Sequence, residues 1–313
     1  MKLARYLEDL PYAALDRGSV VTIGAYDGLH LGHQALLAAV LDRARQDGLL
    51  PVVMSFEPMP REFFAGDRAP ARLMRFREKY EAFADYGFEV FYCPRFSPSM
   101  RDIAAVDFVR RILVHGLNAR HVVIGDDFRF ARRREGHVGT LIDAGRALGF
   151  SVESISSVLV NGVRASSTAT REALAAGDCR QATLLLGRPY RMSGRITRGR
   201  RVGRSLGYPT ANVDIRRRQC AVDGIYAVRV HGIEGGVREG VASVGRRPTF
   251  DIDKPILEVH LFDFDADIYG RYIHVDFIER IRGVEKFDSA DALVAQMHLD
   301  ADNARKILAA EAA

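Results

Sequence analysis

The chain has 313 residues, of which 48% are hydrophobic and 27% are charged, and its formal net charge is +5. This balance is typical of a globular protein and excludes disordered and collagen-like chains, and the length suffices for two hydrophobic cores. The positive charge allows an anionic partner without choosing among a nucleotide, a nucleic acid and a membrane surface. Only five of the 45 basic residues are lysines. Arginine suits phosphate recognition, but the bias is equally explained by genome composition.

The N-terminus lacks the pattern of a signal peptide, and no stretch approaches the roughly 18 apolar residues that cross a membrane. The three cysteines, Cys93, Cys179 and Cys220, are odd in number and widely spaced. This spacing indicates neither a disulfide framework nor a zinc site, and it fits a reducing compartment. We therefore expect a soluble, cytoplasmic protein that binds no membrane.

The first half of the chain alternates strand-like and helix-like segments. Short apolar or β-branched runs predict strands at 19–24, 51–56, 89–93, 121–125 and 151–155, and helical spacing of apolar residues predicts helices at 34–45, 78–86, 106–113 and 140–148. Repeated β-α units predict a parallel sheet. The fold class of this half is therefore α/β, with a Rossmann-like arrangement.

The second half changes to a period of two. Residues alternate between two faces in 225–230, 257–262 and 272–277, which predicts antiparallel strands. Glycine-rich turns without intervening helices favour a small closed barrel. A terminal helix follows, capped by Asp288 or Ser289, with an apolar stripe of Leu293, Met297, Ala304 and Ile307. We place the junction within 178–189, which gives domains of residues 1–182 and 183–313.

Ligands of an open parallel sheet bind beyond the carboxyl ends of its strands. Gly24–His33 follows the first predicted strand, and His30 and His33 lie where a helix begins. Both imidazoles can face an anion that the helix N-terminus attracts. Gly24 and Gly32 let the backbone pass close to a nucleotide. The pattern favours phosphate binding over helix capping or a metal site, which would need a third ligand.

A second anion-binding candidate is the segment 166–171. Its hydroxyls, including Ser167 and Thr168, precede a predicted helix, and Arg171 lies in the first turn of that helix. Plain N-capping explains one hydroxyl but not all of them. Both interpretations stay open from the residues alone.

The second half contains a basic, glycine-rich stretch from Arg188 to Arg218, with ten arginines and one acidic residue. It includes Gly203 and Arg204, and it suits a polyphosphate better than a single-stranded nucleic acid, because only two tyrosines are present for base stacking. Thr210 and Asn212 are oxygen donors on one side of an extended segment and suit Mg²⁺, and a role in a turn or a helix cap would explain the same two residues.

Glu258 stands on the polar face of a predicted strand, opposite the face that carries Leu257 and Val259. A carboxylate there could accept the proton of a substrate hydroxyl. An isolated glutamate on a solvated strand face would explain the same pattern.

Five segments resemble, in the same order, motifs of the bifunctional bacterial riboflavin kinase and FAD synthetase family: His30-Leu-Gly-His33, residues 56–63, 125–130 and 166–171, and Pro209-Thr-Ala-Asn212. The resemblance covers nearly the whole chain. It implies a C-terminal flavokinase barrel that phosphorylates riboflavin with ATP and Mg²⁺, and an N-terminal nucleotidylyltransferase domain that joins FMN to AMP and releases pyrophosphate. Ala131 and Ser243 depart from the family pattern, which usually has glycine and asparagine there.

The resemblance also implies roles for particular residues. In the first half, His30, His33 and Arg171 would stabilise developing charge, Ser167 and Thr168 would hold phosphates, and Asp127 and Arg129 would line the cleft for flavin or nucleotide. In the second half, Glu258 would be the general base, Thr210 and Asn212 would bind metal and nucleotide, and Gly203 and Arg204 would contact ATP or flavin.

Two alternatives remain at this point. One is a nucleotidylyltransferase that acts on a different phosphate acceptor, because the histidine motif does not identify the acceptor. The other is a non-enzymatic protein that binds flavin or nucleic acid. The bifunctional enzyme is preferred, with riboflavin, FMN and ATP as its substrates and with neither nucleic acid nor membrane as a partner.

Overall fold

The structure is a computed structural model that describes residues 1–198, 207–246 and 255–311. The chain forms two compact units, one of Met1–Pro70 and Arg75–Ala165 and the other of Ala71–Met74 and Ser166–Ala313. Each unit has its own hydrophobic core. This division reflects packing alone, so the predicted boundary of the catalytic domains after residue 182 stays a prediction.

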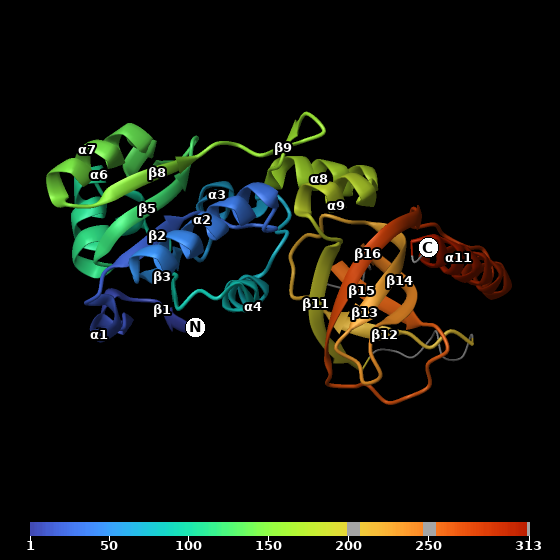
Figure 1. The fold of residues 1–313 in the computed structure, drawn as a ribbon. Coiled ribbons are helices and arrows are strands. Elements are labelled where there is room, and N and C mark those ends of the chain that lie inside the picture. Colours follow the sequence, from blue (N-terminus) through green and yellow to red (C-terminus); the bar gives the residue numbers. More distant parts are fainter. Residues whose placement is uncertain (199–206, 247–254, 312–313) are drawn as a thin grey trace. The chain divides into compact units, whose positions relative to one another are not determined.

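The first unit is built on a six-stranded parallel sheet with the order β1-β4-β3-β2-β5-β8 (Figure 1). The strands are β1 (Lys2–Ala4), β2 (Ser19–Ile23), β3 (Leu50–Met54), β4 (Val90–Tyr92), β5 (Ala119–Gly125) and β8 (Ser151–Ile155). The parallel α/β architecture predicted from the sequence is confirmed. The edge strand β1 was not predicted, because its three residues carry no periodic pattern and it is defined by pairing with β4.

Helices and short ribbons lie between these strands and after β8. They are η1 (Leu7–Asp9), α1 (Tyr12–Leu15), α2 (Leu31–Asp47), α3 (Pro60–Ala65), η2 (Gly66–Arg68), α4 (Phe76–Tyr86), α5 (Pro98–Arg101), α6 (Ala105–Asp107), the π-helix η3 (Phe108–Gly116), β6 (Arg129–Phe130), η4 (Arg132–Arg134), β7 (Gly136–His137), α7 (Val138–Leu148), β9 (Leu159–Val160) and β10 (Val163–Arg164). α2 ends at Gly48, whose φ of +66° is the left-handed conformation that glycine adopts readily. Apolar residues at helical spacing bury Leu37 and Val40 of α2 in the unit.

The second unit contains a closed antiparallel barrel with the order β11-β12-β15-β14-β13-β16, as predicted (Figure 1). The strands are β11 (Tyr190–Thr197), β12 (Ala211–Asp214), β13 (Gly224–His231), β14 (Arg238–Arg246), β15 (Pro255–Leu261) and β16 (Tyr272–Arg282). On β15, Leu257 and Val259 are buried in the barrel core, whereas Glu258 is partly exposed. The alternation read from the sequence therefore gives the correct faces.

The described residues of the second unit also form three helices: α8 (Ser167–Ala176), α9 (Cys179–Leu186) and the terminal helix α11 (Ala290–Ala310). Ser289 caps α11, because its hydroxyl accepts a hydrogen bond from the backbone N–H of Ala292 at 3.1 Å. The buried face of α11 centres on Ala301, Ala304 and Leu308. No helix in the described ranges is both long enough and apolar enough to cross a bilayer.

Candidate active sites

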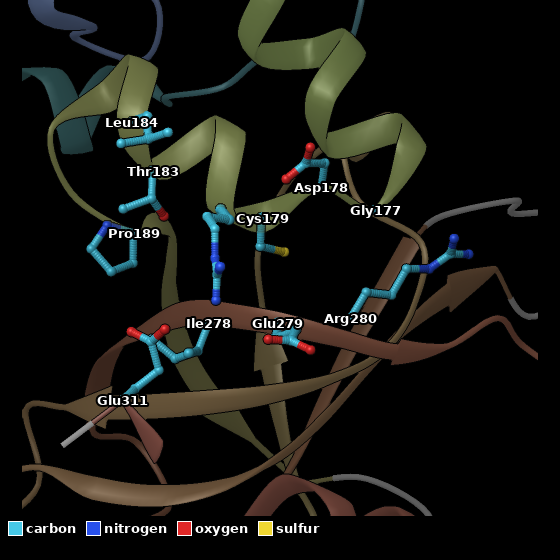
Figure 2. Close-up of a pocket in the computed structure, with 11 residues that line it drawn as sticks. Gly177, Asp178, Cys179, Thr183, Leu184, Pro189, Ile278, Glu279, Arg280 and Glu311 are labelled. Carbon is cyan, nitrogen blue, oxygen red and sulfur yellow. The ribbon is translucent and has the colours of Figure 1, made fainter. Parts of the chain in front are cut away.

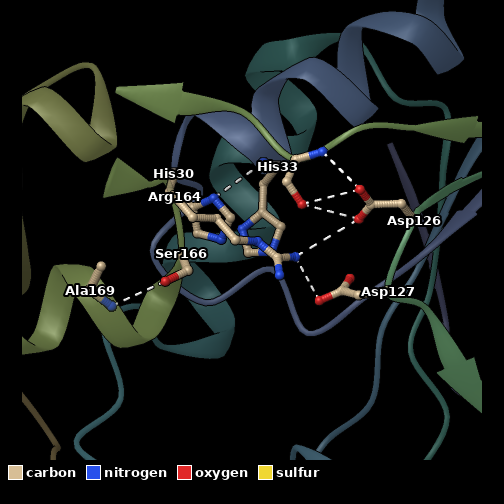
Figure 3. A network of polar contacts seen from close by, with 8 residues as sticks. His30, His33, Asp126, Asp127, Arg164, Ser166 and Ala169 are labelled. Carbon is tan, nitrogen blue, oxygen red and sulfur yellow. Dashed lines mark hydrogen bonds and ion pairs between the residues drawn. The ribbon is translucent and has the colours of Figure 1, made fainter. Parts of the chain in front are cut away.

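His30 and His33 lie at the N-terminus of α2, directly beyond the carboxyl end of β2 (Figure 3). His30 is the N-cap, and its Nδ1 accepts a hydrogen bond from the backbone N–H of His33 at 3.4 Å. The two rings stack with centroids 3.6 Å apart and an interplanar angle of 26°. The sequence motif thus brings both imidazoles to one helix end, where backbone N–H groups and the helix dipole favour an anion.

Burial controls the charge of this histidine pair. It lowers the pKa of His30 to about 4, helped by the nearby Arg164 cation and opposed by Asp127. Burial likewise lowers the pKa of His33 well below its usual value, and the charges of His30 and Lys79 act in the same direction. Near pH 7 both rings are therefore neutral, and each offers one N–H donor.

One ring atom of this pair lacks a partner. Within the described part of the chain, the buried Nδ1 of His33 makes no hydrogen bond. Buried polar atoms are nearly always paired in folded proteins. An orphan atom beside a helix N-terminus is therefore a place where a ligand can supply the missing hydrogen bond.

The loop between β2 and α2 is strained and buried. Tyr26 and Leu29 both have a φ of +50°, a region that costs a bulky residue about 1–3 kcal/mol, yet their exposed fractions are only 0% and 2%. The hydroxyl groups of Tyr26 and Thr22 share a hydrogen bond of 2.6 Å, and the Tyr26 ring lies 5.1 Å from the His33 ring. Packing therefore holds this loop in a conformation that it would not adopt alone.

Gly24 and Gly32 allow close approach within the protein itself. A Cβ on Gly32 would lie 3.2 Å from Nδ1 of His30, and a Cβ on Gly24 would lie 3.0 Å from the Tyr26 ring. Either contact is tight enough to displace the ring. The glycines thus accommodate the site's own side chains, and their predicted contact with a nucleotide stays a prediction.

Asp127 and Arg164 lie near the histidine pair. Nη2 of Arg164 donates to Oδ2 of Asp127 at 2.6 Å, and both charges act on His30 (Figure 3). Arg129 lies on β6 and is exposed. Arg164 was not singled out from the sequence. A lone arginine at the end of the two-residue strand β10 gives no local signal, and only the chain fold brings it to Asp127.

A cluster of phenylalanine rings in the first unit was also missed. The rings of Phe56, Phe63, Phe64 and Phe96 contact one another at centroid distances of 5.2–5.8 Å, and Phe64 is 66% exposed. We call these four residues the aromatic cluster. An exposed aromatic face can stack a planar ring of a ligand. The signal was present in the segment 56–63, where aromatic residues flank the prolines.

In the second unit, the N-cap of α8 is Ser166, whose hydroxyl accepts from the backbone N–H of Ala169 at 3.1 Å. Capping therefore accounts for Ser166 and not for Ser167 or Thr168 in the first turn. Arg171 on the same helix is anchored by two hydrogen bonds: its Nε donates to the carbonyl oxygen of Ala71 at 2.6 Å, and its Nη1 donates to that of Ser167 at 3.0 Å.

The barrel aligns polar residues from neighbouring strands. Asn212 on β12 and Ser243 on β14 are both register partners of Glu258 on β15. Paired residues in antiparallel strands have Cα atoms about 4.5–5.5 Å apart and side chains on the same face. Because Leu257 and Val259 face the core, Asn212, Glu258 and Ser243 form a row on the outer face of the barrel.

The segment before β12 is held from two sides. Nδ1 of His260 donates to the carbonyl oxygen of Pro209 at 2.9 Å, and the Tyr208 hydroxyl hydrogen-bonds Nδ1 of His298 on α11 at 2.5 Å. These contacts fix the backbone just before Thr210. Gly203 and Arg204, also predicted to bind ligand, lie outside the described residues.

The donor set beside Glu258 suits a hard cation. The side-chain oxygens of Thr210 and Asn212 are the kind of ligand that Mg²⁺ prefers, and substrate phosphates would supply further oxygens. No cluster of three or more His, Cys, Asp or Glu side chains with metal-site geometry occurs in residues 1–198, 207–246 or 255–311. A site completed by substrate phosphates does not need such a cluster.

A separate pocket of about 490 Å³ lies in the second unit between α9 and β16 (Figure 2). It is lined by Gly177, Asp178, Cys179, Arg180, Thr183, Leu184, Pro189, Ile278, Glu279, Arg280 and Glu311. Burial raises the pKa of the Cys179 thiol to about 12, so the thiol stays protonated near pH 7. None of the site residues predicted from the sequence lines this pocket.

An α/β unit with two histidines at a helix N-terminus, joined to a barrel with an outer polar row, is an arrangement that suits an enzyme with two sites for phosphorylated substrates. Residues 13–169 match the family model described as FAD synthetase, and residues 186–308 match the one described as riboflavin kinase. The chain belongs to the family of bifunctional riboflavin kinase/FMN adenylyltransferases. The predicted family and the pair of activities are thereby confirmed.

Individual relatives agree over nearly the full length. The bifunctional riboflavin kinase/FMN adenylyltransferase of Escherichia coli K12 is 43% identical over 306 residues, covering 98% of this chain and 97% of that protein. The enzyme of the same description from Pseudomonas fluorescens is 44% identical over 313 residues, covering 100% and 99%. A crystal structure from Streptococcus pneumoniae, described as a macrolide-efflux protein, has 31% identity and a TM-score of 0.81 and covers 96% of this chain and 97% of that one.

Proposed function

We propose that the two reactions of this family run at two separate sites in this chain, one in each half. The barrel phosphorylates riboflavin with ATP and Mg²⁺, and the α/β half adenylylates the resulting FMN with a second ATP. The proposed domain boundary after residue 182 lies between the two matched ranges, 13–169 and 186–308. The three cysteines are thiols, which fits a cytoplasmic enzyme, and riboflavin, FMN and ATP, rather than nucleic acid or membrane, are its proposed partners.

In the kinase site, the row of Asn212, Glu258 and Ser243 is the observation that carries the proposal. Riboflavin attacks through a neutral alcohol, so a base must take up its proton as the bond to phosphorus forms. The Glu258 carboxylate is that base. Thr210 and Asn212 hold Mg²⁺, which neutralises charge on the phosphates, and Gly203 and Arg204 bind the substrates.

In the adenylyltransferase site, the phosphate of FMN is already ionised and attacks the α-phosphorus of ATP while pyrophosphate leaves. No protein base is required, so the useful groups are donors and cations that stabilise the developing charge. His30 and His33 donate from neutral rings, and a bound polyphosphate raises their pKa by attraction.

Further residues bind the substrates of this reaction. Arg171 stabilises charge, Ser167 and Thr168 hold phosphates, and Asp127 and Arg129 line the cleft. The aromatic cluster offers a stacking face for the flavin ring.

Two variants separate the sites. Glu258→Ala should depress FMN formation from riboflavin while sparing FAD formation from supplied FMN, and His33→Ala should do the reverse. Glu258→Gln is the matched control, because it keeps the shape of the side chain but cannot take up the proton. Flavins are separated chromatographically after incubation with ATP and Mg²⁺. Equal loss of both activities in either variant would contradict two independent sites.

A further inference from the structure

The first unit contains a lysine that no step described above uses. Lys79 on α4 has an exposed fraction of 0%, whereas the three other lysines in the described ranges, Lys2, Lys286 and Lys306, are exposed. Only five of the 45 basic residues of the chain are lysines. An arginine-rich chain thus places a lysine at a fully buried position.

The surroundings of Lys79 make this burial unusual. α4 also buries Phe83, whose ring contacts those of Tyr26 at 5.4 Å and Phe91 at 5.0 Å. An ammonium group in such a place is unfavourable unless other groups compensate it. Replacing a whole buried ion pair by apolar side chains of similar volume is often neutral or stabilising, so a buried charge is not in itself a gain in stability.

Lys79 reaches the strained loop that leads to the histidine pair. Its Nζ donates to the carbonyl oxygen of Ala25 at 3.3 Å. Ala25 precedes Tyr26, which has a φ of +50°. Lys79 also acts on the other end of the loop, since its charge contributes to the lowered pKa of His33. One buried cation thus donates a hydrogen bond at the start of the loop and lowers the pKa of the imidazole at its end.

We propose that Lys79 is a positioning residue for FMN adenylylation: its ammonium group fixes the carbonyl of Ala25, and with it the loop from β2 to α2, and adds positive potential behind the phosphate site at His33. This inference rests on the proposed role of the histidine pair. Lysine suits the position better than arginine, because its compact charge ends a slender apolar stem that can lie among aromatic rings.

The test compares Lys79→Met, which keeps length and removes charge, with Lys79→Arg, which keeps charge, and with Lys2→Met as the control for an exposed lysine of the same unit. Removing one preorganised donor beside developing charge typically lowers kcat about 10²–10³-fold. Because Lys79 acts through the loop, we expect Lys79→Met to lower kcat/KM for FMN adenylylation about tenfold to a hundredfold. Lys79→Arg should recover part of this loss, and Lys2→Met should match the unmodified enzyme.

Three readouts separate positioning from a structural role. Riboflavin phosphorylation by Lys79→Met should be unchanged, and the thermal unfolding temperature of Lys79→Met is measured to establish that the variant is folded under the assay conditions. Magnesium pyrophosphate, a product of adenylylation only, should bind about tenfold more weakly in isothermal titration, without any turnover. The proposal would be overturned if folded Lys79→Met kept adenylylation and pyrophosphate binding within about twofold of the unmodified enzyme. It would also be overturned if folded Lys79→Arg lost as much adenylylation activity as Lys79→Met.

His33→Ala, measured in parallel, distinguishes the two levels of the argument. If His33→Ala leaves FAD formation intact, the proposed phosphate site itself is wrong. If His33→Ala abolishes FAD formation while Lys79→Met does not affect it, only the inference about Lys79 is wrong.

Discussion

The buried histidine pair predicts that the first unit loses stability in mild acid. The pKa of His30 is about 4 in the fold and 6.5 as an ordinary histidine. Because the pKa of His30 is lowered in the fold, the unfolded state binds a proton that the folded state does not bind. The free energy of unfolding therefore falls as the pH drops from about 6.5 toward 4. One pKa unit is worth about 1.36 kcal/mol, so His30 alone accounts for about 2 kcal/mol at pH 5 and about 3 kcal/mol over the full window.

The variant His30→Asn isolates this contribution. Asparagine is a good N-cap, so the start of α2 is kept while the titrating group is removed. His115→Asn is the control, because His115 is an exposed histidine of the same unit. Urea unfolding of the first unit is measured near pH 7.5 and near pH 5 by pulse-labelling hydrogen exchange, read out by mass spectrometry of peptides from β2 and α2. All labelling pulses are applied at one common pH, so that only the unfolding equilibrium differs between the two conditions.

The unmodified protein and His115→Asn should lose at least about 2 kcal/mol of unfolding free energy between these pH values, a shift of about 1 M in the urea midpoint. His33 adds to this loss, because its pKa is lowered as well. His30→Asn should lose about 2 kcal/mol less than the unmodified protein. If the pH sensitivity of His30→Asn equals that of the unmodified protein, burial does not keep His30 neutral and the reasoning is refuted.

Three further substitutions give distinct results. Ala131 has a φ of +63° and a ψ of −174°, a region of backbone conformation that is essentially restricted to glycine. Ala131→Gly should therefore raise the unfolding free energy of the first unit by about 1 kcal/mol. A lower melting temperature of this variant would contradict the prediction. The carboxylate of the buried Asp300 accepts hydrogen bonds from Nε and Nη2 of Arg282 at 2.9 and 2.7 Å. Asp300→Ala should therefore lower the free energy of unfolding of the second unit in urea by about 3 kcal/mol. A change within about 0.5 kcal/mol would show that the ion pair contributes little to stability. Asn212→Ala should raise the Mg²⁺ concentration for half-maximal riboflavin phosphorylation about tenfold and leave FMN adenylylation unchanged; an unchanged Mg²⁺ requirement would remove Asn212 from the metal site.

The fold was predictable because its main signals are local. β15 reads as alternating buried and exposed residues, and that alternation alone places Glu258 on the outer face. The parallel strand β3 reads as a continuous apolar run and β2 as a mostly β-branched run, as expected for strands buried on both faces. β1 could not be found this way, since three residues form a strand only because β4 lies beside them.

The sites were predictable only in part. The motif that contains His30 and His33 and the segment before β12 each consist of consecutive residues, so both can be recognised in the sequence. Lys79 and Arg164 come from distant segments, and nothing in the sequence reveals that Lys79 is buried or that Arg164 reaches Asp127. The charge of the histidines was also hidden, because it depends on burial, and burial is a property of the folded chain.

The same burial links acid sensitivity to the chemistry proposed for the first unit. A charged imidazole left in this environment would be unfavourable, so the rings stay neutral until opposite charge arrives. An incoming polyphosphate provides that charge, and the unpartnered Nδ1 of His33 and the donors at the N-terminus of α2 are already in place for it. Protein groups that are fixed before the substrate binds need little reorganisation as charge develops. Because the histidines of such a site are buried and unprotonated before an anion binds, the folded protein loses stability in acid.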